Sequence, residues 1–211
     1  HGAVAVSRCA LEEGADVLAV ATVDEGLELR AAGFTVPILI LGLIPASAAG
    51  AAIDADLTMT VSDISLAKAI SSAAVERDRL AKIHLKLETG MGRIGVAIDD
   101  SVALAVKISQ LPHVELEGMF SHFADADNDD RTFTARQIEI FSATADDVQR
   151  VFDDFGGKIF LCDVKTYLHA FNVANIDKIF DAELAAYLLN PEKDKSERDA
   201  ELYIGNVAML E

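Results

Sequence analysis

The chain has 211 residues, 51% hydrophobic and 25% charged, which excludes disorder as its main state and suffices for one large or two small domains. Its net charge of −17 disfavours a broad nucleic-acid-binding surface, because an acidic field repels phosphate backbones. The longest apolar run, Val36–Pro45, is too short to span a membrane, and no signal peptide is evident. Cys9 and Cys162 make no disulfide framework, which indicates reduced thiols in a cytoplasmic protein.

The first 152 residues alternate helical spacing with short apolar runs of strand length. In chain order, the predicted elements are a helix over Val4–Glu13, a strand over Val17–Ala21, a helix over Asp24–Ala32, a strand over Pro37–Leu41, a helix over Ala46–Ala55, a strand over Leu57–Val61, a helix over Ser65–Leu80, a strand over Ile83–Leu87, a helix from Asp99 or Asp100 to Gln110, a strand over Val114–Phe120 and a helix over Thr134–Phe152. This order predicts an α/β fold with a parallel sheet covered by helices. An open doubly wound sheet and a (β/α)8 barrel both remain compatible with five such strands.

Residues 153–211 form a second predicted unit, a short mixed α/β or mostly helical tail in which the strand–helix alternation does not clearly continue. The boundary is placed near Asp153–Gly157. Its predicted elements are a strand, two helices and a charged, solvated or disordered run: Lys158–Cys162, Val164–Phe171, Phe180–Leu189 and Pro191–Ala200.

A glycine-rich segment, Gly90–Gly95, matches G-x-G-x-x-G after a strand. A dinucleotide site would open a helix directly after the motif, but the next helix is predicted to begin only at Asp99 or Asp100, and three strands precede the motif. A structural glycine turn is a second interpretation. The third is the loop of a barrel site, where Arg93 would face a ligand from the carboxyl end of a strand.

Two further residues are candidates for a site. His122 follows the strand over Val114–Phe120, although a lone histidine is more often structural than catalytic. Lys86 lies within an apolar strand, so it is either exposed at an edge or paired or neutralised inside a barrel. Cys9 lies in a helix of small residues and is expected to be buried in the protein core.

No metal site is predicted. The acidic segment from Asp125 to Asp130 fails as a calcium loop, because its sixth position holds Asp130 rather than Gly and its twelfth holds Arg136 rather than Glu. An acidic surface loop is the expectation.

The motifs resemble those of a known family, the bacterial alanine racemases. His84–Gly95 (HLKLETGMGRIG) resembles one signature strand and loop, and Glu117–Asp127 (EGMFSHFADAD) resembles the second. Pro37–Gly42 is similar to the third barrel strand, and His1–Ala3 resembles the end of the segment that holds the cofactor lysine. The resemblance covers about residues 1–152, the predicted first domain.

The resemblance implies a partial (β/α)8 barrel of the fold-type III pyridoxal-phosphate (PLP) enzymes, acting on L- and D-alanine for cell-wall synthesis as a homodimer. It also implies cofactor-binding roles. Arg93 matches an arginine that hydrogen-bonds the phenolic oxygen of PLP, and Lys86 matches a lysine that is carbamylated in several members and bonds that arginine. His122 matches a histidine behind the arginine at the pyridine nitrogen, and Leu41 matches a residue packed near the cofactor.

Several family residues are not found, so no catalytic residue is assigned. The chain begins with His1 rather than Met, and the Schiff-base lysine with its following tyrosine is expected before it. The later barrel strands and the domain with the tyrosine base are also not recognised, so we expect a fragment that is inactive alone. Glu88 stands where many members have Asp.

The tail resembles a different family. About residues 157–195 are similar to the 3′–5′ exonuclease-like domain of bacterial family A DNA polymerases, with Tyr167 where active members carry a metal-binding Asp. Two alternatives to the racemase therefore remain: a non-catalytic, barrel-derived interaction protein, and a polymerase exonuclease fragment.

Overall fold

The computed structural model describes residues 2–151, 158–161 and 179–181. The described strands form one parallel sheet in the order β1-β2-β3-β4-β6-β7-β8, with β5 paired to the end of β4. Their bounds are β1 Leu18–Val20, β2 Ile38–Leu43, β3 Thr58–Val61, β4 Ala81–Glu88, β5 Val96–Ala97, β6 Val114–Phe120, β7 Lys158–Leu161 and β8 Ile179–Asp181. The five predicted strands are thus present, and β5 is an addition.

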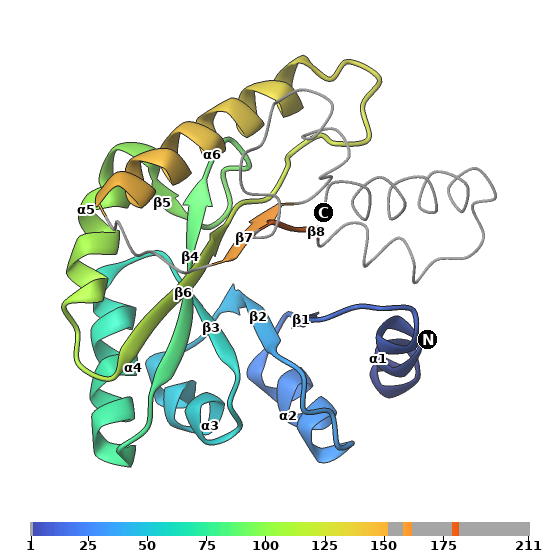
Figure 1. Cartoon of the computed structure of the whole chain (residues 1–211), viewed down its shortest axis with the longest axis vertical. Helices are drawn as coiled ribbons and strands as arrows, with labels where there is room; N and C mark the ends of the chain where they lie inside the picture. The colour runs from blue at the N-terminus through green and yellow to red at the C-terminus, as the bar shows by residue number, and fades with distance from the viewer. Residues whose placement is uncertain (1, 152–157, 162–178, 182–211) are drawn as a thin grey trace.

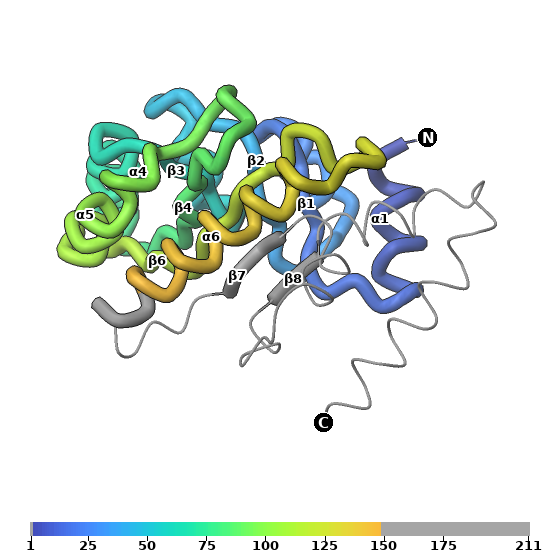
Figure 2. Tube along the Cα trace, turned by 90° about the horizontal axis from the view of Figure 1, so that it is seen from above, coloured from blue at the N-terminus to red at the C-terminus, as the bar shows by residue number. Residues whose placement is uncertain are grey.

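Helices connect the strands. Their bounds are α1 Ala3–Glu12, α2 Val23–Ala31, the 3-10 turn η1 Ala46–Ala48, α3 Ala49–Asp54, α4 Ile64–Arg77, α5 Ile98–Ser109 and α6 Thr132–Val151. Figure 1 shows α2 to α6 in an arc around the sheet, and Figure 2 shows the same arrangement from above.

The residues at the helix starts explain where these helices begin. Thr22 caps α2 through a reciprocal pair of hydrogen bonds with Glu25. Asp63 caps α4 by accepting from two backbone N–H groups of the first turn, at 2.7 and 3.0 Å. The helix that was expected to begin with Asp99 or Asp100 as its cap begins at Ile98 instead. Its N-cap is Ala97, and the two aspartates lie in the first turn, where their charges interact favourably with the helix dipole.

The main core lies between the sheet and the helices. Alternate residues of β4, Ile83 and Leu85, are fully buried there, and Ile70 of α4 and Ile108 of α5 pack in the same cluster. The intervening residues of β4 must face the other side, since side chains alternate along a strand. Helices on one face and a polar inner face match an incomplete (β/α)8 barrel, whereas a doubly wound sheet has helices on both faces.

The sheet extends past residue 152, where the sequence predicted that the strand–helix alternation does not clearly continue. β7 pairs with β6 in parallel, and β8 pairs with β7. The strand expected from Lys158 is confirmed, but the helix expected from Phe180 was wrong at its start, because Phe180 lies within β8. Ile179 and Phe180, a β-branched and an aromatic residue, suit a strand at this position. The domain boundary near residue 153 stays a prediction, and the other predicted tail elements lie outside the described residues.

Cys9 is exposed on α1, so its expected core position was wrong. The buried positions of α1 are Ser7 and Ala10, three residues apart on one face, and Cys9 points away from that face. Among the described helices, none combines the length and apolar character that a membrane span requires.

Candidate functional site

The candidate site lies at the carboxyl ends of β4 and β6, which are parallel neighbours with Lys86 opposite Phe120. Arg93 belongs to the loop that follows β4, and His122 lies two residues beyond β6. Because both loops leave the same edge of the sheet, residues far apart in the sequence are brought to one place. The sequence predicted this arrangement from the position of each motif after a strand.

Lys86 is buried, with 3% of its surface exposed. Its Nζ lies 4.6 Å from the centroid of the Phe120 ring, a cation–π distance. An exposed edge position, one of the two interpretations of this lysine, is therefore excluded. The ammonium faces the inner side of the sheet, and a charge so placed needs compensation from its surroundings.

His122 is exposed beyond β6, with two cations nearby, Lys86 and Arg93. Partial burial lowers the pKa of His122 below 6.5, and the positive charges of Lys86 and then Arg93 lower it further. Both cations therefore act on His122, and the neutral form of its imidazole is favoured near pH 7. A direct contact between Lys86 and Arg93, expected from the resemblance, stays a prediction.

Leu41 lies on β2, two strands from β4 in the sheet order, and is 37% exposed. It is two residues from Leu39, which packs with Phe120 and Val17 in a small apolar cluster separate from the main core. The pairing of β2 with β3 is irregular between Ile40 and Leu43, so simple alternation does not fix the face of Leu41. Its role near a cofactor stays a prediction.

Glu88 organises the loop that carries Arg93. Its carboxylate accepts the N–H groups of Gly90 at 2.7 Å and of Arg93 at 3.2 Å. Burial raises the pKa of Glu88, but backbone N–H groups of residues 90–93 outweigh it, so the pKa falls below its ordinary value. In the sequence, Glu88 stands out only because many family members have Asp at this position.

The glycines of this loop have structural roles, which argues against the dinucleotide interpretation of the G-x-G-x-x-G motif and is compatible with a barrel-site loop that carries Arg93. Gly95 has φ +143°, and a Cβ there would lie 2.7 Å from the backbone N of Glu88. Gly90 has φ +137°, and a Cβ there would lie 2.8 Å from Phe133. The helix α5 begins only at Ile98, beyond β5, so its amino terminus does not follow the motif as a pyrophosphate site requires.

A set of buried polar residues beneath these loops was not predicted: Thr89, Ser121, Thr134 and Gln137. Thr89 and Ser121 follow strand ends, which is a usable signal, but nothing local marks Gln137 on α6.

The acidic segment beyond His122 forms its own turns. Asn128 donates to Asp125 at 2.8 Å, and Asp130 accepts two hydrogen bonds from Thr132. These bonds occupy carboxylate oxygens within the loop. In the part of the chain that the structure describes, no group of three or more His, Cys, Asp or Glu side chains could hold a metal ion.

Comparison with known proteins identifies one family. The model of the alanine racemase N-terminal domain matches residues 1–154. Alanine racemase 2 of Caldanaerobacter subterraneus is 46% identical over 143 residues, which cover 67% of this chain and 37% of that protein. The alanine racemase of Methanococcus maripaludis is 42% identical over 150 residues, covering 71% of this chain and 40% of that protein.

Solved structures agree with these relatives. An alanine racemase of Clostridium difficile 630 superposes with a TM-score of 0.73 at 35% identity, covering 77% of this chain and 42% of that one. The alanine racemase of E. faecalis superposes with a TM-score of 0.74 at 29% identity, covering 92% and 52%. The chain spans about two fifths of the length of the curated relatives that it matches.

Proposed function

Because the chain belongs to the alanine racemase family, we propose that its barrel forms part of a PLP site in an enzyme that interconverts L- and D-alanine. The family is PLP-dependent. The product, D-alanine, would supply cell-wall synthesis, and the assembled enzyme would be a homodimer, as the family resemblance implies.

One observation carries this proposal: Lys86, Arg93 and His122 are grouped at the carboxyl ends of two neighbouring strands. PLP presents anionic phosphate and phenolate oxygens, which bind cations and charged hydrogen-bond donors. The buried ammonium of Lys86 and the exposed guanidinium of Arg93 supply that chemistry. The residues present therefore fit the cofactor.

In this proposal Arg93 would donate to the phenolic oxygen of PLP, and its permanent charge keeps it a donor at any working pH. Lys86 would interact with Arg93 from the buried side, unmodified or carbamylated. His122, in its neutral form, would orient the arginine that contacts the pyridine nitrogen in the family. When bound, PLP supplies an electron sink for the electron pair left as the α-proton of alanine is removed.

The test is PLP binding to the complete 211-residue chain, measured by equilibrium dialysis. We expect Arg93→Gln to weaken binding about tenfold or more, because a charge-assisted hydrogen bond is lost. Arg79→Gln is the matched control, since Arg79 precedes the opposite end of the same strand and its side chain has one described hydrogen bond, from Nη1 to the Asp54 carbonyl at 3.0 Å. Equal affinities of the wild type, Arg93→Gln and Arg79→Gln would refute the assignment. No binding by the wild type would favour a cofactor-free interaction protein.

A second proposal concerns the tail. The similarity of residues 157–195 to a polymerase exonuclease-like domain implies an inactive module, because Tyr167 stands where a metal-binding Asp is needed. We expect no Mg²⁺- or Mn²⁺-dependent degradation of single-stranded DNA by the purified chain. Degradation that is abolished by Asp181→Asn would show a working exonuclease instead.

A further inference from the structure

Gln137 of α6 joins the two loops of the candidate site through hydrogen bonds. Its Nε2 donates to Thr89 Oγ1 at 3.0 Å and to the His122 carbonyl at 3.2 Å. Its Oε1 accepts from the Ala124 N–H at 3.0 Å. One side chain thus bonds Thr89 at the start of the Arg93 loop and two backbone groups of the other loop, the His122 carbonyl and the Ala124 N–H.

The network continues to the strand. Thr89 Oγ1 and Ser121 Oγ lie 2.7 Å apart, and Ser121 Oγ donates to the Leu87 carbonyl at 3.0 Å. Since the hydroxyl of Ser121 already donates its one proton to the Leu87 carbonyl, the hydroxyl of Thr89 must donate to Ser121 and accept from Gln137. The donors therefore run in one direction, from the Gln137 amide to the carbonyl between Lys86 and Glu88.

This network is buried. Gln137 is 1% exposed, Thr89 6% and Ser121 9%. Water cannot readily replace a lost partner at such positions, so removing one member leaves the others unsatisfied. Gly90 completes the contact, because a Cβ there would lie 3.6 Å from Gln137 Cγ. The Arg93 loop consequently begins directly against this side chain.

We propose that Gln137 is a positioning residue that fixes the loop of Arg93 relative to the loop of His122. The inference rests on the proposed PLP site for its functional meaning. The geometry itself can be tested without the cofactor, because the pKa of His122 depends on its burial and on the charges of Lys86 and Arg93.

The experiment compares Gln137→Met with Thr144→Val in the complete chain. Methionine keeps the length of the side chain but removes the three hydrogen bonds. Thr144 lies on the same helix, is 3% exposed and bonds only the Ile140 carbonyl of its own helix in the described structure, so its variant reports lost helix stability alone. The pKa of His122 is measured by NMR titration, with His122→Gln assigning the signal, and PLP affinity is measured by dialysis.

We expect Gln137→Met to raise the pKa of His122 toward 6.5, because the imidazole becomes less buried and moves away from the two cations, and to weaken PLP binding about tenfold. Thr144→Val should change neither. An unchanged pKa in folded Gln137→Met overturns the proposal, whatever the PLP result. Should Gln137→Met not fold, Thr89→Val and its conservative partner Thr89→Ser decide in the same way: the pKa should rise in the first and return in the second.

The two proposals fail separately. If the wild type does not bind PLP, the proposed function is wrong, while the titration of His122 still decides whether Gln137 positions the loops.

Discussion

Gly95 returns the backbone of the Arg93 loop to strand β4. A Cβ at this residue would meet the main chain of Leu87 and Glu88 at 2.8 and 2.7 Å, where no flexible side chain can move aside. Gly92, in the same loop, has φ +69° with no atom within 4 Å of its Cβ position. Alanine at Gly95 would therefore meet both an unfavourable φ and a steric clash, whereas alanine at Gly92 would meet the unfavourable φ alone.

We predict that Gly95→Ala lowers the free energy of unfolding by about 3 kcal/mol or more, because a φ penalty of about 1–3 kcal/mol is added to a main-chain clash. Gly92→Ala should show the φ penalty alone, about 1 kcal/mol. Urea denaturation of both variants measures the difference. An equal loss in the two variants would contradict the close approach at Gly95.

Residues whose chemistry is unusual for their place in the chain were predictable from the sequence. Lys86 in an apolar strand and Arg93 between glycines were marked by their own neighbours in the chain. Glu88 and Gln137 were missed, because their partners are backbone groups and loops that come together only in the folded chain. Cys9 was misplaced because a helix of small residues does not reveal which of its faces is buried.

The pairing of β4 with β6 contains a register shift between Ile83 and His84, which leaves Glu117 without a direct partner. Its Oε2 lies 3.4 Å from His84 Nε2 and 3.1 Å from Thr58 Oγ1, and Lys82 Nζ lies 3.8 Å from its Oε1. The irregular residue therefore links β3, β4 and β6 on the inner face of the sheet.

The pKa of Glu117 is lowered from 4.5, first by hydrogen bonding from His84; burial opposes this, and the charges of His84 and Lys82 and the hydroxyl of Thr58 assist it. A carboxyl with a depressed folded pKa stabilises the fold above its unfolded pKa, and this contribution is lost as the pH falls through the folded value. We predict that Glu117→Gln costs about 1–2 kcal/mol at pH 7.

The cost should diminish as the pH falls below about 4.5, because the unfolded carboxylate then binds a proton before the folded one does, and it should vanish once the pH is below the lowered folded pKa. Urea unfolding at pH 7 and in a series of buffers below pH 4.5 measures it, with Glu115→Gln on the same strand as the control. A difference between wild type and Glu117→Gln that grows in acid would contradict the linkage.

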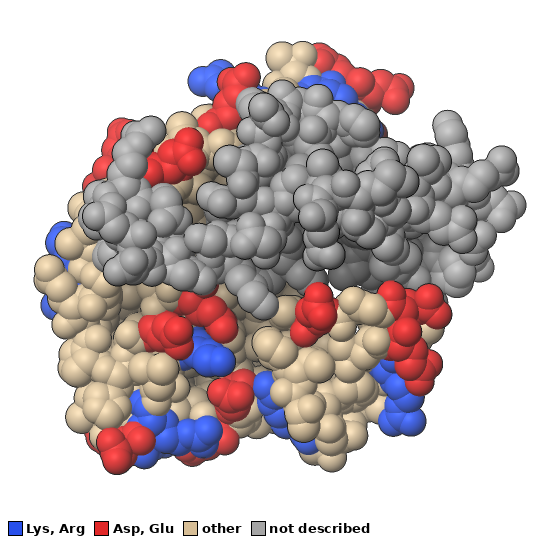
Figure 3. Space-filling model, viewed as in Figure 1, with Lys and Arg blue, Asp and Glu red and all other residues tan. Residues whose placement is uncertain are grey.

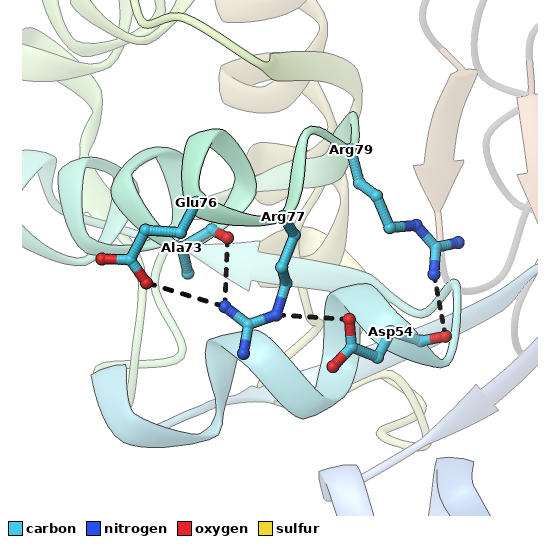
Figure 4. Close-up of polar contacts among 5 residues, drawn as sticks. All are labelled: Asp54, Ala73, Glu76, Arg77 and Arg79. Carbon is cyan, nitrogen blue, oxygen red and sulfur yellow. Dashed lines mark hydrogen bonds and ion pairs between the residues drawn. The ribbon is translucent and has the colours of Figure 1, made fainter.

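Helices α3 and α4 are joined near the amino ends of the strands, as Figure 4 shows. Arg77 Nε lies 3.2 Å from Asp54 Oδ1, and its Nη1 donates to the Ala73 carbonyl at 3.2 Å. The guanidinium occupies the space that a Cβ on Gly50 would fill. The glycine in α3 is thus explained by the arginine in α4.

Gly50→Ala should therefore have a context-dependent effect. In an Arg77→Ala background, we predict a stabilisation of about 0.5–1 kcal/mol, the usual gain of alanine over glycine in a helix. In the wild type, displacement of Arg77 should cancel that gain. Urea denaturation of the double-mutant cycle measures the coupling, and additive effects would show that the two residues are independent.

Element boundaries were mostly predictable because hydrophobic periodicity marks them. The exceptions have local causes: β5 has only two residues, too short for any periodicity, and α5 begins without a side-chain cap. β8 was missed because three residues in a tail of different composition give no alternating pattern.

At the scale of the molecule, the described part is a partial barrel with an acidic surface. Figure 3 shows acidic side chains interspersed with basic ones on the face in view, without a continuous basic patch among its described residues. The barrel was one of two closures that the sequence allowed. Helices on one face decided between them, and this depends on contacts between distant segments that periodicity does not record.

We predict no measurable racemase activity from a polypeptide of these 211 residues alone. It corresponds to about two fifths of the length of related racemases, and no base has been identified in it for either face of the substrate. A missing general base alone costs about 10²–10⁴-fold. A coupled D-alanine assay with saturating PLP checks this, with a complete racemase as the positive control. Turnover that needs PLP and survives Lys86→Ala would show a catalytic lysine elsewhere in the chain.

The alternation of polar and apolar side chains along β4 restricts how this gene can change. Deleting or inserting one codon within the strand would exchange its faces, turning Ile83 and Leu85 inward and driving His84 and Lys86 against the helices. Substitutions that keep this pattern can accumulate in β4, whereas changes in the length of the strand cannot. Descendants of this sequence should therefore vary in length outside β4, for instance in the exposed turn near Asp129.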